Sequence, residues 1–170
     1  MELKGENLIN IAFNHWLKKY GFDARVRGVD TDFFWYHDDT ISYSFFFPYE
    51  SAENWELLLD ELGCEYKVDI FYSAFLHELG HSNTYDAFEE EEIKECEEIH
   101  RLICEEPNSF AESPEYVYSH LPVEYEATRW AVEYMNQYPE RIAELVNLVG
   151  KAVRNFYRIN EVVTEDMFFN

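Results

Sequence analysis

The segment His77-Glu78-Leu79-Gly80-His81 constrains this chain more than any other feature of its sequence. If the segment is helical, His77 and His81 lie about one turn apart on the same face, because an α-helix has about 3.6 residues per turn. Their imidazole nitrogens can then bind one ion, and Glu78 lies beside that ion. A hydrolytic zinc site needs two such nitrogens, an open position for water and a nearby carboxylate. The segment therefore predicts His77 and His81 as Zn²⁺ ligands and Glu78 as the general base.

The residues before this segment favour a buried helix. Residues 68 to 81 are mostly apolar, and we expect a helix there that ends near residues 82 to 84. Burying two histidines and a glutamate is costly unless something pairs with them, and a metal ion supplies that pairing. The apolar positions of this stretch are Ile70, Phe71, Ala74, Phe75 and Leu79.

Length and composition favour one folded domain spanning residues 1 to 170. Hydrophobic residues make up 47% of the chain and aromatic residues 18%, which excludes a disordered protein. The sequence contains no run of 18 apolar residues, about the length that spanning a membrane requires, and its first residues lack the layout of a signal peptide. The three cysteines, Cys64, Cys96 and Cys104, have no spacing typical of a disulfide framework. We therefore expect a cytoplasmic protein.

The formal net charge of −22 limits the partners of this chain. Such a surface repels nucleic acid phosphates and anionic membranes, so we expect neither as a direct partner. It suits a basic protein or peptide substrate. It also suits an alternative function, in which a non-enzymatic acidic protein imitates nucleic acid and keeps only a structural or vestigial metal site. The sequence gives no indication of the oligomeric state.

Periodicity and turn residues predict an α+β fold that is mostly helical, with a small β-hairpin before the metal-binding helix. The hairpin has strands at residues 33 to 36 and 41 to 47. The stretch from residue 107 to 114 is the least regular, and residues 161 to 170 hold at most one further turn. Helices are expected at residues 6 to 20, 53 to 62, 88 to 105, 122 to 137 and from 139 onwards.

A catalytic zinc site needs a third protein ligand, and the helix at residues 122 to 137 offers two glutamates. Glu124 and Glu126 flank the apolar face of this helix on opposite sides, each about 80° from its centre. Helical geometry therefore does not choose between the two. The residues taken to form that face are Val123, Ala127, Trp130, Ala131 and Tyr134.

The two motifs together give a family resemblance. The HExxH segment, followed by the downstream pattern Glu-x-Glu-Ala-x-x-x-Ala, resembles zincin metallopeptidases with a glutamate as third ligand, closest to the ImmA/IrrE-type bacterial and phage group. The resemblance implies a zincin-like fold, peptide-bond hydrolysis and a bound Zn²⁺. It implies Glu126, the glutamate just before Ala127, as the third ligand. Thr128 stands where the family usually has Asn or Asp.

Further residues are candidates for roles around this site. A donor that stabilises a developing oxyanion is expected near the second motif, and Asp86 is a weaker candidate for accepting a hydrogen bond from a ligand imidazole. Zincins bind extended peptides along a sheet edge, so we expect part of the hairpin, with the strand from Ile41 to Phe47, to bind substrate. The candidate oxyanion donors are His120, Tyr116, Tyr118 and Tyr125.

A second metal site on the acidic helix is disfavoured. Cys96, His100 and Cys104 recur every four residues, and each is a good zinc ligand. However, the two cysteines lie about 12 Å apart along a straight helix, too far to share one ion. Buried cysteines on an apolar stripe are the simpler interpretation.

Overall fold

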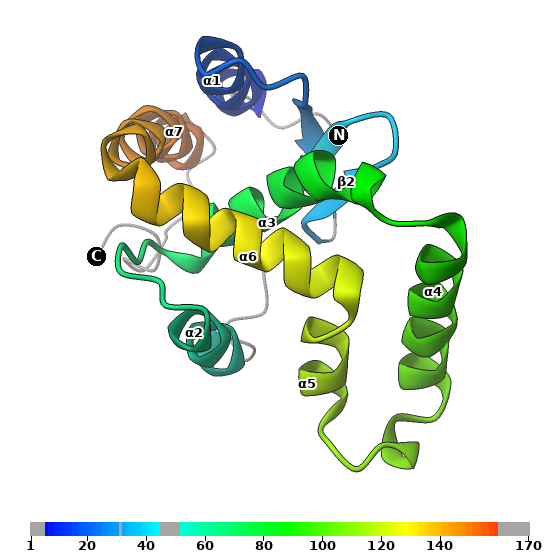
Figure 1. The fold of residues 1–170 in the computed structure, drawn as a ribbon. Coiled ribbons are helices and arrows are strands. Elements are labelled where there is room, and N and C mark those ends of the chain that lie inside the picture. Colours follow the sequence, from blue (N-terminus) through cyan, green and yellow to red (C-terminus); the bar gives the residue numbers. More distant parts are fainter. Residues whose placement is uncertain (1–5, 31, 45–51, 160–170) are drawn as a thin grey trace.

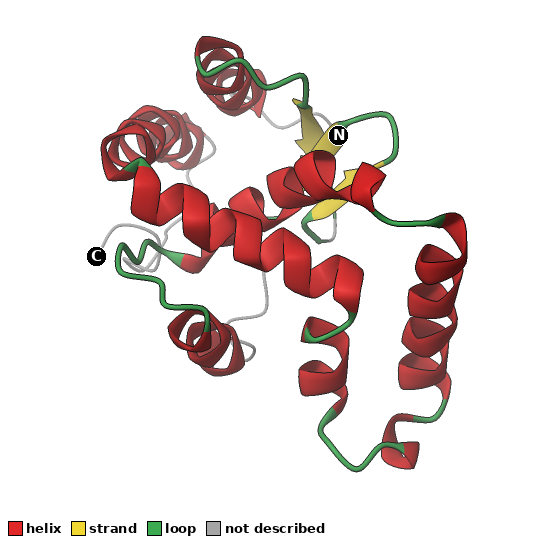
Figure 2. Cartoon of the chain, viewed as in Figure 1, coloured by secondary structure: helices red, strands yellow, loops and turns green. Residues whose placement is uncertain are grey.

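A computed structural model describes residues 6–30, 32–44 and 52–159 of the chain. The described part is an α+β fold in which helices predominate over one small sheet, as Figure 2 shows. The predicted class is therefore confirmed. The strands are β1 (Arg25–Val29), β2 (Phe34–Tyr36) and β3 (Thr40–Tyr43). The α-helices are α1 (Glu6–Lys19), α2 (Ala52–Glu61), α3 (Ile70–Thr84), α4 (Glu90–Glu105), α5 (Pro114–Ser119), α6 (Pro122–Gln137) and α7 (Pro139–Ile159), with 3₁₀ turns η2 (Tyr85–Ala87) and η3 (Pro107–Ser109).

The sheet has the strand order β1-β3-β2. The predicted hairpin is confirmed for its described residues: β2 and β3 pair antiparallel, with Trp35 opposite Ile41. Strand β1, which pairs parallel with β3, was not predicted. It makes β3 the central strand, so the described residues from Ile41 onwards do not form a sheet edge, and β2 is the part of the hairpin that does. The free edge of the hairpin beside α3 belongs to β2, and residues 45 to 47 lie outside the described residues.

Helix α3 runs through the centre of the molecule and crosses α6 (Figure 1). It begins after Asp69, whose side chain accepts a hydrogen bond from the Phe71 backbone and so satisfies one free N–H of the first turn. The helix is apolar on nearly all sides. Aromatic residues of α1 and the sheet cover one flank, and α6 covers another. Gly80 sits at the crossing, where an added Cβ would lie 2.3 Å from the backbone oxygen of Ala127. A glycine here lets α3 and α6 approach closely.

The main core is aromatic and lies between α1, the sheet, α3 and α7. Phe13 of α1 packs against Tyr43, Phe71 and Phe75 with ring centroids 4.5–6.1 Å apart. Trp16 donates a hydrogen bond from its ring to the Arg141 carbonyl (2.8 Å), which joins α1 to the start of α7. These contacts fix the face of α3 that is turned away from the solvent.

Helices α4 and α5 form an arm that extends from the body of the molecule (Figure 1). Glu89 and Glu92 form a capping box at the start of α4. A small separate cluster of buried residues, Cys96, Leu121 and Val123, packs the base of the arm against α6. The short helix α5 was not predicted and begins at the end of the stretch that was expected to be irregular.

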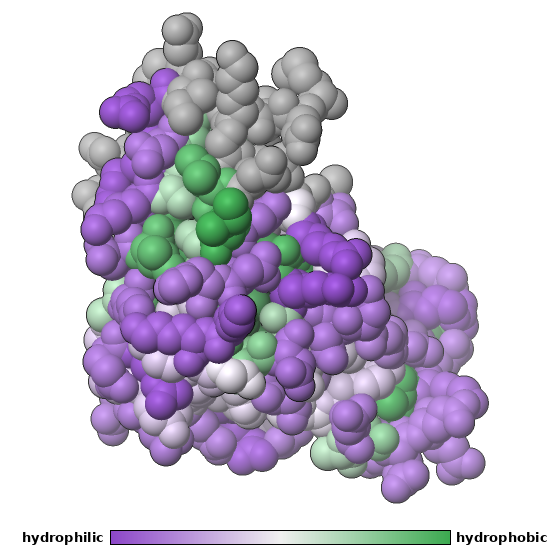
Figure 3. Space-filling model, turned by 90° about the horizontal axis from the view of Figure 1, so that it is seen from above, coloured by the Kyte–Doolittle hydropathy of each residue, from purple (hydrophilic) through white to green (hydrophobic). Residues whose placement is uncertain are grey.

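The outer surface is mostly hydrophilic, as the view in Figure 3 shows for one face, in keeping with the charge of −22. No helix in the described ranges combines the length and apolar character that crossing a bilayer requires. The other predicted helices are confirmed within a few residues at their ends. The turn expected between residues 161 and 170 lies outside the described residues.

Candidate metal centre

The structure brings His77 and His81 of α3 together with Glu124 of α6. The Oε2 atom of Glu124 lies 3.0 Å from Nε2 of His77 and 3.3 Å from Nε2 of His81. The imidazole centroids of the two histidines are 4.7 Å apart. Both histidines and Glu124 are nearly buried. Two ring nitrogens one helical turn apart and one carboxylate from a second helix therefore converge on one point.

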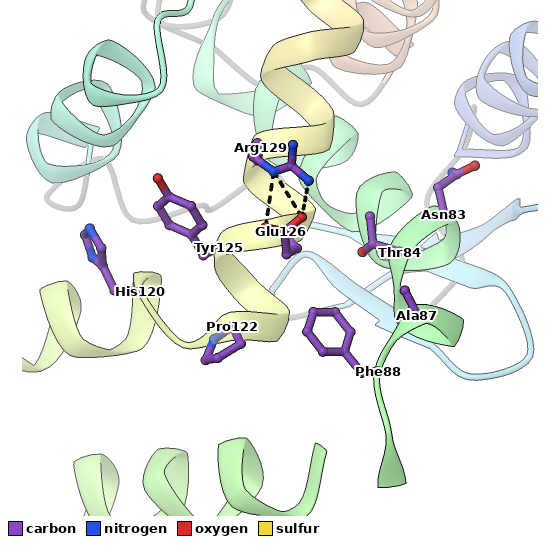
Figure 4. A pocket seen from close by; sticks show the side chains of 9 residues that line it. All are labelled: Asn83, Thr84, Ala87, Phe88, His120, Pro122, Tyr125, Glu126 and Arg129. Carbon is purple, nitrogen blue, oxygen red and sulfur yellow. Dashed lines mark hydrogen bonds and ion pairs between the residues drawn. The ribbon is translucent and has the colours of Figure 1, made fainter. Parts of the chain in front are cut away.

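The structure does not bring Glu126, which the resemblance implied as the third ligand, to this point. Its carboxylate accepts a hydrogen bond from Nε of Arg129 (3.0 Å) on the outer side of α6. Figure 4 shows this pair in a hollow of about 650 Å³, lined also by Thr84 and Phe88. The histidine pair is not among the residues that line this hollow. Glu124, the alternative that helical geometry left open, occupies the place by the histidines.

The burial pattern of α6 explains the difference. The face that packs inward includes Thr128, Val132 and Met135, whereas Trp130 is only partly buried. When the face is centred on the buried residues, Glu124 lies about 20° from its centre and Glu126 about 140° away, at 100° per residue. The face assumed from sequence was displaced because it included Trp130 and omitted these three residues.

Thr128 determines which ring nitrogen of His77 carries the hydrogen. The Thr128 hydroxyl donates its only hydrogen to the Glu124 carbonyl (3.1 Å), so it must accept from Nδ1 of His77, 2.9 Å away. A neutral His77 then presents the lone pair of Nε2 to the Glu124 carboxylate. Two acceptors 3.0 Å apart repel each other unless a proton or a cation lies with them. Two imidazoles and one carboxylate form one of the donor sets found in catalytic zinc sites.

The interaction between His77 and Glu124 also shifts the pKa of both groups. Burial opposes charge on His77, but the hydrogen bond to Glu124 and the nearby carboxylates raise its pKa above the ordinary value. Burial likewise opposes ionisation of Glu124, yet the bonds from His77 and His81 hold its pKa well below the usual range. The carboxylate is therefore ionised, and the pair attracts positive charge.

Aromatic rings hold both histidines in place. Trp55 of α2 packs edge-on against His77, with ring centroids 5.5 Å apart. Trp35 of β2 stacks on His81 with centroids 5.9 Å apart and an angle of 25° between the rings. The Nδ1 atom of His81 is buried and has no hydrogen-bond partner among the described residues. Packing therefore orients His81, whereas packing and Thr128 together orient His77.

Glu78 lies next to the histidine pair. Ligand atoms of His77, Glu78 and His81 all lie within 4.8 Å of one another. Burial raises the pKa of Glu78, and the backbone N–H of Trp35 donates a hydrogen bond that partly opposes this rise. A carboxyl group with a raised pKa, close to the metal position, suits a group that takes up and releases a proton.

A cavity of about 280 Å³ opens onto Glu78, His81 and Glu124. Tyr118 of α5 lines this cavity, and burial followed by the charges of Glu124 and Glu78 raises the pKa of its hydroxyl, so it stays protonated. Tyr118 is therefore the one candidate oxyanion donor that the structure places at the site. The other three lie elsewhere: Tyr116 stacks on His120, and Tyr125 and His120 line the hollow of Figure 4.

The remaining candidates do not join the centre. Asp86 lies in η2, and Thr128 makes the contact with a ligand imidazole that Asp86 was considered for. Among the described residues, Cys96, His100 and Cys104 form no converging metal-binding group. Cys96 is buried in the cluster at the base of the arm, and Cys104 is exposed.

Comparisons with protein-family models, with curated proteins and with solved structures gave no match for this chain. The chemistry of the site therefore has to be argued from its own geometry.

Proposed function

We propose that this protein is a zinc-dependent metallopeptidase that hydrolyses peptide bonds. The observation that carries the proposal is the convergence of His77 Nε2, His81 Nε2 and Glu124 Oε2 beside Glu78. These are two nitrogen donors, one oxygen donor and a neighbouring base, which is the composition of a hydrolytic zinc site. The cavity next to them gives water and a substrate a way to the site.

Each residue then has a definite task. A zinc ion held by His77, His81 and Glu124 would lower the pKa of a water molecule towards neutrality and polarise a carbonyl group. Glu78 accepts a proton from the attacking water and delivers it to the leaving amine, so the proton moves from water to nitrogen. Its partly buried position and raised pKa favour this transfer. Tyr118, which keeps its proton, donates a hydrogen bond to the oxyanion that forms.

The surroundings of the centre support a zincin-like arrangement. Helix α3, which carries the HExxH segment, follows a small sheet in the chain, and the Glu124 carboxylate comes from the later helix α6. Strand β2 is the free edge beside Glu78, since the Trp35 backbone contacts that carboxylate. An extended peptide lying along β2 would place a carbonyl near Glu78. The cytoplasm as the site of action belongs to this proposal and rests on the cysteine pattern of the sequence.

The acidic arm favours a second candidate function. The exposed face of α4 carries a run of glutamates, which would suit binding to a basic protein without catalysis. In that case the metal would be structural, and Glu78 would be dispensable. The two functions therefore differ in the role of one side chain.

The test compares wild-type protein with Glu78→Gln. Zinc per chain is measured by mass spectrometry, and cleavage is measured on a mixture of peptides from digested cell protein. We expect about one zinc in both proteins and a loss of cleavage of about 10²–10⁴-fold in the variant. Equal cleavage by both proteins, or no zinc in either, would contradict the proposal. Zinc binding with no cleavage by wild type would favour the acidic binding protein.

A further inference from the structure

The cavity beside Glu78 has room for one side chain rather than for a whole peptide. Its volume of about 280 Å³ is below the range of about 300–1,000 Å³ typical of pockets for drug-sized ligands. Glu78, His81 and Glu124 line it together with residues of α4. A peptide whose scissile bond reaches Glu78 would therefore place one neighbouring side chain in this cavity.

The cavity is lined by three carboxylates and three histidines, and among the described residues by no lysine or arginine. Glu78 and Glu124 already have partners, the Trp35 backbone and the histidine pair. Glu97 contributes a third carboxylate, from the α4 wall, and it has no ion pair with any described residue.

The basic residues nearest to Glu97 on α4 are already paired with other glutamates. Both Lys94 and Arg101 lie within one turn of Glu97, yet each pairs with other glutamates. Lys94 pairs with Glu90, and Arg101 pairs with Glu98 and Glu105. Glu97 therefore lines the cavity without an ion pair to any described residue, whereas Glu95, which also has no such ion pair, lies outside the cavity.

Aromatic rings complete the walls of the cavity. Trp35 and Tyr85 lie with their centroids 5.0 Å apart and their planes at 50°. Tyr85 and Glu97 line the same cavity, and burial, followed by the charge of Glu97, raises the pKa of Tyr85. Faces of Trp and Tyr attract cations, and a nearby carboxylate adds to that attraction.

We propose that this cavity selects a lysine or arginine side chain next to the cleaved bond. Glu97 pairs with the cationic end of that side chain, and Trp35 and Tyr85 flank its aliphatic stem. The proposal rests on the peptidase function proposed above and names its substrate class. Exposed ion pairs contribute less than about 1 kcal/mol, so we expect a preference of about fivefold, equivalent to about 1 kcal/mol.

The first measurement is binding, which needs no cleavage. Zinc-loaded full-length Glu78→Gln is titrated in a calorimeter with N-acetyl-Ala-Ala-Xaa-Ala-Ala-amide, where Xaa is lysine, norleucine or glutamate. We expect lysine to bind about fivefold more tightly than norleucine, and glutamate more weakly than both. Adding Glu97→Gln should remove the difference between lysine and norleucine. Adding Glu95→Gln is the matched control, because Glu95 is exposed on the same helix outside the cavity and carries the same charge.

The second measurement is cleavage by the wild-type enzyme. Cell protein is digested with a glutamate-specific protease, which leaves internal lysines and arginines, and new termini are identified by mass spectrometry. We expect basic residues to be enriched at one position beside the cleaved bond. The enrichment should be lost in Glu97→Gln, kept in Glu95→Gln, and replaced by acidic residues in Glu97→Lys.

The two measurements separate the two proposals. Cleavage without enrichment of basic residues would overturn the selectivity and leave the peptidase function intact. Binding of lysine peptides that depends on Glu97, without any cleavage, would overturn the peptidase function and leave the cavity as a site for basic side chains. Equal binding of all three peptides, or an equal loss of lysine preference in Glu95→Gln, would overturn the selectivity, because bulk charge would then account for the binding.

Discussion

Glu124 and Glu126 stand two residues apart on α6 and have opposite surroundings. Glu124 faces two histidines in a nearly buried site, whereas Glu126 pairs with Arg129 at the surface. We expect Glu124→Gln to weaken zinc binding by at least about tenfold, since even residues that only support a ligand contribute about 10–100-fold. Glu126→Gln should leave zinc affinity unchanged. Competition with a coloured chelator measures both affinities, and a loss confined to Glu126→Gln would refute the assignment of Glu124.

Thr128 supports the centre without reaching the metal position. Its hydroxyl fixes the hydrogen of His77 on Nδ1, which leaves Nε2 free to bind. Thr128→Val keeps the shape of the side chain and removes the acceptor, so we expect zinc affinity to fall about 10–100-fold. Thr128→Ser, which keeps the hydroxyl, should bind nearly as wild type does. The same chelator competition checks this, and equal affinities for the valine and serine variants would show that the hydrogen bond has no role.

Sequence reasoning was sufficient for residues whose relation is local. His77, Glu78 and His81 could be placed together because one helix sets their spacing. The choice of Glu124 depends on which side of α6 meets α3, and that is decided by tertiary contacts at Gly80 and Ala127. The buried positions of Val132 and Met135 were the available signal, since both are apolar.

At the scale of elements, periodic segments were predictable and short ones were not. Long amphipathic helices such as α6 and α7 follow from their apolar spacing. Strand β1, with sequence Arg-Val-Arg-Gly-Val, has little apolar pattern. Its pairing with β3 is a tertiary contact that the local sequence does not indicate. The short helix α5 begins with a Ser113 cap and Pro114, signals that were present in an irregular stretch.

The crossing of α3 and α6 depends on Gly80. An added Cβ would lie 2.3 Å from the Ala127 backbone oxygen, and a backbone atom in a helix cannot give way as a flexible side chain can. We expect Gly80→Ala to lower the free energy of unfolding by about 1–3 kcal/mol and to weaken zinc binding, because α6 carries Glu124. Urea unfolding followed by circular dichroism measures the first effect.

Gly150→Ala in α7 is the matched control for this change. Its nearest neighbour is the Tyr72 hydroxyl at 3.2 Å, the end of a side chain. Alanine is also favoured over glycine within a helix by up to about 1 kcal/mol. We therefore expect Gly150→Ala to be close to wild type in stability and in zinc affinity. Equal losses in both variants would show that the close approach of the helices is not the cause.

At the scale of the molecule, the candidate metal position lies where α3 crosses α6. Both helices contribute to one hydrophobic core, α3 with Phe75 and α6 with Met135, and α6 leads from the acidic arm into α7. A cation bound by His77, His81 and Glu124 would require this arrangement of the two helices, which only the folded state provides. Ligands that bind only the folded state stabilise it by about 2.7 kcal/mol at 100 times the dissociation constant. If the proposed centre binds zinc, metal binding is therefore coupled to folding stability.

The coupling predicts the response of the melting temperature to zinc. For a chain of this size, 1 kcal/mol shifts the melting temperature by about 2–4 °C, so saturating zinc should raise it by about 5–10 °C relative to protein treated with a chelator. His77→Ala should lose most of this shift. Magnesium at equal concentration screens the charge of −22 as zinc does but prefers six oxygen ligands, so it should give a much smaller rise. Differential scanning calorimetry measures all three, and an equal rise with magnesium would show that general screening, rather than a specific centre, stabilises the fold.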